Sequence, residues 1–326
     1  MTLPQKVARL DIPGAVLLAA ALACLLLALQ WGGTTYAWSN LRVWGCLLGF
    51  GLLFMAFALL QVKLGDRQVS FNTLSNDHLM KSISRATIPG RIVFKRTAAA
   101  GCAFTIFISM AIGVHVYYLP FYFQAVLGNT ALQSGIRTLP YLMALLLTPM
   151  ISGILITLVG YYVPFMLVGS TLISIGSSLL FTLSPHSSKG QWISYQILAA
   201  FGAGLCRQIA FSAVPLVLHE DDLATASALV AFCNSLGPTL AIGIGQSIFT
   251  TSFVQQVSSV SSIDVKEILT IGASNLSAFV SSSQLGIVEQ AFNYALTRAF
   301  ILSTASAGAA FCCSAAMEWI NVKKKD

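Results

Sequence analysis

Eight long apolar runs dominate this chain and limit what it can fold into. A helix that crosses the roughly 30 Å hydrocarbon core of a bilayer needs about 20 apolar residues. The runs cover residues 13–31, 43–62, 98–121, 138–159, 164–183, 192–218, 224–251 and 292–318. Two of them are interrupted by charge, at Arg207 and Arg298. We therefore expect an all-α membrane protein with about eight transmembrane helices.

The composition favours lipid as the solvent for most of the surface. Charged residues make up 9% of the 326 residues, whereas globular domains carry roughly 25%. The net charge of +7 comes from short clusters between the apolar runs. A nucleic-acid site needs a continuous basic face, so the partner we expect is the lipid bilayer and not nucleic acid.

The sequence shows no pattern that is typical of an enzyme or a metal site. The seven cysteines all fall inside apolar runs, where small packing residues are more common than disulfides or metal ligands. The phosphate-binding pattern GxxxxGK[ST] is absent, and the predicted spans carry no paired carboxylates. The acidic cluster Glu220-Asp221-Asp222 stands where a helix begins and is interpreted as a helix N-cap. We expect no catalysis, no cofactor and no metal.

The basic residues predict the orientation. With both termini in the cytosol, 12 Lys and Arg lie on the cytosolic side and 4 on the other, which is the bias that membrane proteins show. The sequon Asn275-Leu276-Ser277 then falls in an external loop, residues 252–291, and Asn275 is a predicted glycosylation site.

Several motifs carry a family resemblance. The segment from Asp11 to Trp38, DIPGAVLLAAALACLLLALQWGGTTYAW, resembles the seventh helix of fourteen-helix drug:proton antiporters of the major facilitator superfamily, as found in fungi. The resemblance continues in YYLPFYFQAVLGNTALQSGIRTLP (117–140), SGILITLVGYYVPFMLVGS (152–170), YQILAAFGAGL (195–205) and FNYALTRAF (292–300). The motifs keep the order and spacing of the family over nearly the whole chain.

The resemblance implies a domain organisation. Residues 1–63 would be two linker helices, 64–97 a basic cytoplasmic loop, 98–320 the C-terminal six-helix half, and 321–326 a basic cytoplasmic tail. The eight spans would be helices seven to fourteen, and the motifs of the N-terminal half, including those linked to proton coupling, have no counterpart here. Residues 68–84 lack family character, and we interpret them as an insertion or translated intron.

Arg207 is the most informative polar residue within a span. It lies about 15 residues into its run, roughly 22 Å along a helix, and ionisable residues at such depth are functional candidates. The family often carries glutamines here, so the resemblance implies that Arg207 and Gln208 face the central cavity. Arg207 would then be the counter-charge of an anionic substrate. Pairing with another helix, or extension toward the inner membrane surface, is the alternative.

Three further residues are candidates for the substrate pathway. Asn234 stands beside Gly237-Pro238, which resembles a helix break of the antiporter type that would expose a backbone carbonyl. Gln246 lies twelve residues on, about 120° around the same helix. His115 could titrate near physiological pH, although a lone histidine is more often a hydrogen-bonded packing residue.

Other motif positions are assigned to gating or anchoring. Arg137 matches the family stretch SGxRxLP and would anchor the outer start of its helix. Gly153 and Gly160 match the gating-loop motif, in which Leu158 stands where the family often has a basic residue. Arg298 lies near the outer end of the last span, so we expect it to extend to the interface.

These observations favour a secondary active transporter that works by alternating access between two six-helix halves. The resemblance implies proton-coupled efflux of drugs, toxins or fungal secondary metabolites, from the plasma membrane or from a vacuolar or vesicle membrane. The substrate would be small and lipophilic or anionic. Uptake, for instance of a siderophore, and a non-transporting remnant are the alternatives. An N-terminal half or a homodimer would complete the transporter.

Overall fold

The computed structural model describes residues 11–33, 35–74, 90–218, 222–257, 282–321 and 323, with the backbone alone at 64–74, 91, 93 and 282–285. Eight helices in these ranges are long and apolar enough to cross a membrane, which confirms the predicted number and the all-α class. They are α2 (Ile12–Trp31), α3 (Leu41–Leu74), α5 (Arg96–Phe121), α6 (Ala131–Val159), α7 (Val163–Phe181), α8 (Lys189–Arg207), α10 (Leu223–Val257) and α13 (Ser282–Ala315).

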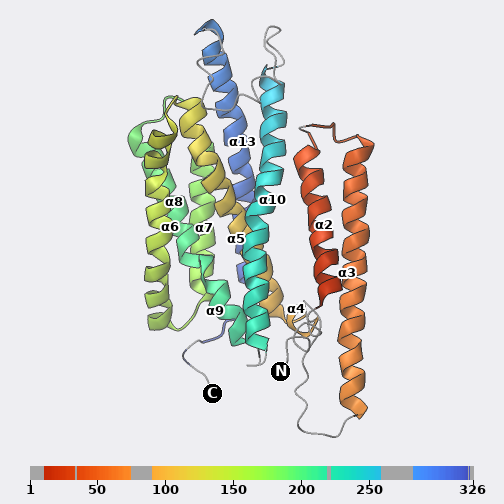
Figure 1. Ribbon diagram of the computed structural model, residues 1–326. Helices are drawn as coiled ribbons and strands as arrows, with labels where there is room; N and C mark the ends of the chain where they lie inside the picture. Colours follow the sequence, from red (N-terminus) through yellow and green to blue (C-terminus); the bar gives the residue numbers. More distant parts are fainter. Residues whose placement is uncertain are drawn as a thin grey trace.

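Shorter elements extend two of these spans. The π-helix η1 (Tyr122–Val126) continues α5, and α9 (Ile209–Leu216) continues α8, while α4 (Gly90–Val93) precedes α5. Successive spans run in opposite directions (Figure 1). The start of α2 and the end of α13 therefore lie at the same end of the molecule, which we call the inner end; the opposite end is the outer end.

Six spans form one bundle, and α2 and α3 form a hairpin beside it (Figure 1). Within the bundle α5 packs along α10 and α13, α7 packs along α8 and α13, and α6 packs along α8. The hairpin reaches the bundle mainly through α2, which contacts α10. In lipid such contacts depend on close packing and not on the exclusion of water.

Glycines allow the closest helix crossings. A Cβ atom on Gly237 of α10 would lie 2.5 Å from the carbonyl oxygen of Ile106 in α5. A Cβ atom on Gly176 of α7 would lie 2.5 Å from the backbone nitrogen of Ala199 in α8. Both distances are far below van der Waals contact, so these crossings require glycine.

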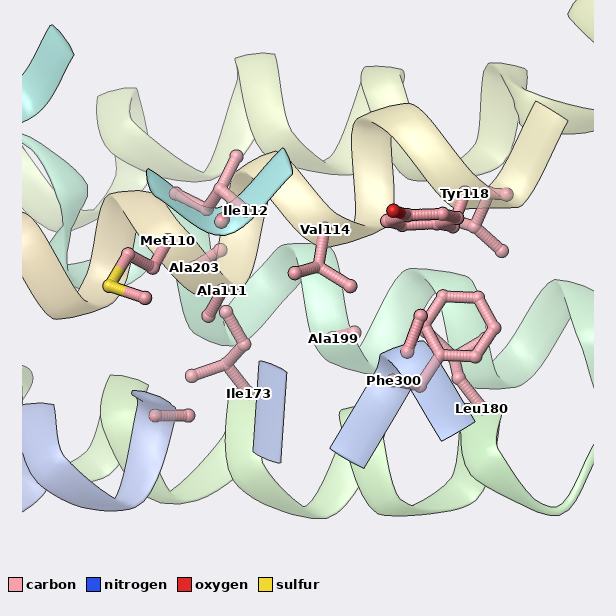
Figure 2. Close-up of a cluster of buried hydrophobic side chains, with 14 of the residues drawn as sticks. Met110, Ala111, Ile112, Val114, Tyr118, Ile173, Leu180, Ala199, Ala203 and Phe300 are labelled. Carbon is pink, nitrogen blue, oxygen red and sulfur yellow. The ribbon is translucent and has the colours of Figure 1, made fainter. Parts of the chain in front are cut away.

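The buried core lies where α5, α7, α8 and α13 meet (Figure 2). The labelled side chains in this core are Met110, Ala111, Ile112, Val114, Tyr118, Ile173, Leu180, Ala199, Ala203 and Phe300. Ala199 and Ala203 on α8 are small, which lets α8 approach its neighbours closely.

Several helices extend beyond the predicted spans. α6 begins at 131 instead of 138 and α8 at 189 instead of 192, because Thr130 with Gln133 and Ser188 with Gln191 form capping boxes that start the helices earlier. α10 continues to 257 and α13 begins at 282, so the predicted loop 252–291 is shorter than expected. Asn275 lies outside the described residues. Hydropathy marks the hydrocarbon-crossing part of a helix, whereas the backbone hydrogen bonds continue into the polar zone.

The predicted loop 64–97 is also partly helical. α3 continues to Leu74, through the Gly65-Asp66-Arg67 turn of the family resemblance and into the segment 68–84. Residues 75–89 lie outside the described ranges, so the origin of that segment stays a hypothesis.

Candidate substrate pathway

The span that carries Arg207 is broken at that residue. The predicted span is confirmed as one apolar crossing, Lys189–Leu216. Within it α8 ends at Arg207 and α9 begins at Ile209, and Gln208 between them keeps a right-handed conformation with φ −88° and ψ −13°. We call this one-residue interruption the break. Arg207 is 18 residues from the start of α8, about 27 Å, and nine from the end of α9, about 13 Å. It therefore lies nearer the inner end than predicted.

Neither side chain at the break is fully buried. Arg207 is half-buried and Gln208 is exposed. Both residues at the break can therefore be reached from outside the bundle, as a pathway residue requires.

α10 passes through Pro238 without a break, which corrects the expected unwinding beside Gly237. Pro238 has no N–H, so the carbonyl of Asn234 four residues earlier loses its helical partner. The helix stays intact because this segment is packed against α5, where Pro238 contacts Gly113. The side-chain oxygen of Asn234 accepts a hydrogen bond from Ser109 at 2.8 Å. Asn234 is half-buried at the α5–α10 contact.

Gln246 lies on another side of α10 from Asn234. Its neighbour Gly245 packs on the Tyr118 ring of α5, and its other neighbour Ser247 lies near Gly33, after α2. Gln246 is half-buried between these contacts. The 12-residue separation is about 18 Å along the helix, so the structure does not bring Asn234 and Gln246 together.

His115 lies at the centre of a buried polar cluster, which we define as His115, Tyr141, Ser177 and Ser303. Its Nδ1 atom is 3.1 Å from the Tyr141 hydroxyl, and its Nε2 atom is 3.0 Å from Ser177 Oγ and 2.8 Å from Ser303 Oγ. Both serines donate to backbone carbonyls, which leaves their oxygens as acceptors for Nε2–H. Nδ1 then accepts the Tyr141 proton. The side chain of His115 is fully buried.

Two arginines contact aromatic rings at the outer end. The Arg137 guanidinium lies 5.9 Å from the centroid of the Trp192 ring, and the Arg137 carbonyl accepts from Gln196 at 3.2 Å. Arg137 is in the second turn of α6 and not at its start, so it joins α6 to α8. Arg298 lies 5.9 Å from the ring centroid of Phe181, the last residue of α7.

The turn between α6 and α7 is joined to the C-terminal segment. Gly160 ends α6 with φ +85°, a left-handed conformation that favours glycine. The Lys323 ammonium donates to the Leu158 carbonyl at 2.6 Å. Lys323 of the C-terminal segment thus places its positive charge beside Leu158, the position where the family often has a basic side chain. Gly153 lies five residues before Leu158, about one and a half turns. It is exposed, and nothing lies within 4 Å of its Cβ position.

Comparison with known proteins finds relatives that match nearly the whole chain. No family model matches the chain. It is 39% identical over 315 residues to the MFS-type transporter ltbE of Aspergillus luteorubrus, covering 97% of this chain and 54% of that protein. It is 36% identical over 325 residues to the MFS-type efflux pump MFS1 of Trichophyton rubrum (99% and 57%) and 36% over 323 residues to the efflux pump roqT of Penicillium rubens (99% and 57%).

The chain is similar to one part of these MFS-type transporters. It spans about half the length of the curated relatives it matches. The similarity and the eight apolar helices together make it a multi-pass membrane protein.

Sequence reasoning missed the partners of several of these residues. Tyr141, Ser177 and Ser303 complete the polar cluster, and their hydroxyls gave no spacing signal because serines in membrane helices commonly bond to their own helix. The role of the C-terminal segment was also missed. Tyr162, just after α6, donates to the Glu318 carbonyl at 2.6 Å. Burial, together with the Glu318 carboxylate, raises the pKa of Tyr162 to about 12, so it remains a donor.

Proposed function

We propose that this chain is one helical bundle of a secondary active transporter that exports small lipophilic molecules in exchange for protons. The supporting observation is its similarity, over 97–99% of its length, to proteins named as MFS-type transporters and efflux pumps. Because the chain spans about half of those proteins, the activity belongs to a larger assembly. The second bundle would come from the rest of a longer chain or from a second copy.

The proposed mechanism is alternating access. The substrate would bind between two bundles near the membrane midplane and be exposed to each side in turn. In this bundle the broken span at Arg207 and Gln208 would supply part of the binding wall, and Asn234 another. The buried cluster around His115 joins α5, α6, α7 and α13, so these helices would move as one unit.

Proton coupling would depend mainly on the other bundle. The eight spans hold one acidic residue, Glu289, near the outer end of α13. A carboxylate that exchanges protons during transport usually lies within a span. We therefore propose that the residues that bind and release the coupled proton are supplied by the bundle that completes the assembly.

An uptake assay tests the proposal. Inside-out vesicles would be prepared from yeast cells that produce this chain together with the N-terminal part of a matched relative such as the MFS1 pump. An acid interior should drive saturable uptake of rhodamine 6G, and nigericin, which collapses the pH gradient, should abolish it. Vesicles without the chain are the control. Uptake that needs ATP, or that is unaffected by nigericin, would contradict proton-coupled export.

A further inference from the structure

We infer that Arg207 is the recognition site for an acidic group on the substrate, so that the transporter favours lipophilic carboxylic acids over neutral analogues. This inference rests on the proposed function and names its substrate class. It depends on three features of Arg207: the direction of its side chain, its lack of an acidic partner, and its position at a helix break.

The side chain of Arg207 extends toward the middle of the membrane. Side chains on a helix lean toward its N-terminus, which for α8 is the outer end (Figure 1). α6 runs alongside in the same direction, with Thr148 packed against Gly204. Tyr141 is seven residues before Thr148, about 10 Å nearer the outer end. This lean directs the Arg207 side chain away from the inner surface, toward the level of Tyr141 in α6.

Among the described residues, no carboxylate within the spans lies at the depth of Arg207. Glu289, the one acidic residue within the spans, is near the outer end of α13, while Arg207 is nearer the inner end. Within the described part of the chain, Arg207 forms no ion pair and no hydrogen bond with another residue. An uncompensated guanidinium in a span is costly, and a substrate anion would lower that cost.

The break supplies a second polar group. Gln208, directly after Arg207, is the turn residue between α8 and α9. Gln208 is exposed beside Arg207, and its amide can donate to a second carboxylate oxygen. Arg298 provides the contrast, because its guanidinium lies over the rings of Tyr294 and Phe181. A single unpaired cation with an adjacent amide suits one carboxylate on an otherwise apolar molecule.

A binding measurement with a matched pair of ligands tests the inference. The assembled transporter, produced as in the uptake assay and purified into nanodiscs, would be titrated with pyrenebutyric acid and with its methyl ester, which lacks only the charge. The unmodified protein should bind the acid about tenfold more tightly or better. Arg207→Gln should remove that preference and leave ester binding unchanged, while Arg207→Lys should keep part of it. Arg298→Gln, the control, should keep all of it.

The outcomes separate this inference from the proposed function. Equal weakening of acid and ester in Arg207→Gln would overturn the inference and indicate that Arg207 pairs with another part of the transporter. A preparation that transports rhodamine 6G but binds the acid no better than the ester would also overturn it, and would leave the proposed function standing. Absence of proton-driven transport of both rhodamine 6G and pyrenebutyric acid would remove the proposed function and the inference together.

Discussion

The Nε2 atom of His115 in α5 lies 2.8 Å from the hydroxyl of Ser303 in α13, although 188 residues separate them in the chain. The same nitrogen reaches Ser177 in α7, and the other ring nitrogen reaches Tyr141 in α6. One buried imidazole thus joins four helices. Both ring nitrogens of His115 have hydrogen-bonding partners. The cluster therefore adds hydrogen bonds between helices to a core that is otherwise held by apolar packing.

Substitutions of two adjacent serines on α7, Ser177 and Ser178, test the contribution of this cluster to stability. Ser177 is buried against His115, whereas Ser178 is exposed and bonds only within its own helix. We expect Ser177→Ala to destabilise the protein by about 0.6 kcal/mol, up to about 1.7 kcal/mol, the range for hydrogen bonds between membrane helices. Ser178→Ala should be neutral. His115→Ala should cost more than Ser177→Ala, because it removes three contacts and leaves the Tyr141 hydroxyl unpaired.

Thermal unfolding in detergent, followed by size-exclusion chromatography, measures these differences. An unfolding temperature that falls equally in Ser177→Ala and Ser178→Ala would contradict the role given to the cluster.

The crossing of α5 and α10 should not tolerate a side chain at Gly237. A Cβ atom there would lie 2.5 Å from a backbone oxygen of α5, so the helices must separate. We expect Gly237→Ala to cost about 1–3 kcal/mol, as overpacked cores do. Gly153→Ala is the control, since its Cβ position is open and alanine favours the helix by up to about 1 kcal/mol. The same thermal unfolding assay measures the difference between the two variants. Equal unfolding temperatures would rule out a close crossing of α5 and α10 at Gly237.

Both termini should face the cytosol, and Asn275 should carry a glycan. The reason is the excess of basic residues on the predicted inner side. Asn275→Gln should abolish a shift in mass that endoglycosidase also removes. A cysteine introduced beside Lys324 should react with an impermeant maleimide only after cells are permeabilised. Its modification in intact cells would reverse the predicted orientation.

This chain alone should not transport. One bundle offers one wall of a site that must open to each side in turn, and its polar residues would face lipid at a cost. Proteoliposomes that contain only the 326-residue chain should therefore show no saturable flux driven by a proton gradient. The assembled transporter of the uptake assay is the positive control. Robust flux from the chain alone would instead favour a homodimer as the working unit.

The number of spans, the all-α class and the positions of the charges along the chain follow from the sequence itself. They depend on local composition, because about 20 apolar residues in a row can hardly occupy anything but a bilayer. The capping boxes at Thr130 and Ser188 are local in the same way. The family resemblance also depends on order and spacing along the chain.

The tertiary structure decided where the helices break and what the buried polar groups contact. The sequence pointed to Pro238 for a break, but packing against α5 holds that helix intact, and the break lies at Arg207 and Gln208 instead. The partners of His115 lie 26, 62 and 188 residues away. Hydropathy is a property of neighbouring residues, whereas these contacts depend on how distant helices are placed, which no local pattern encodes.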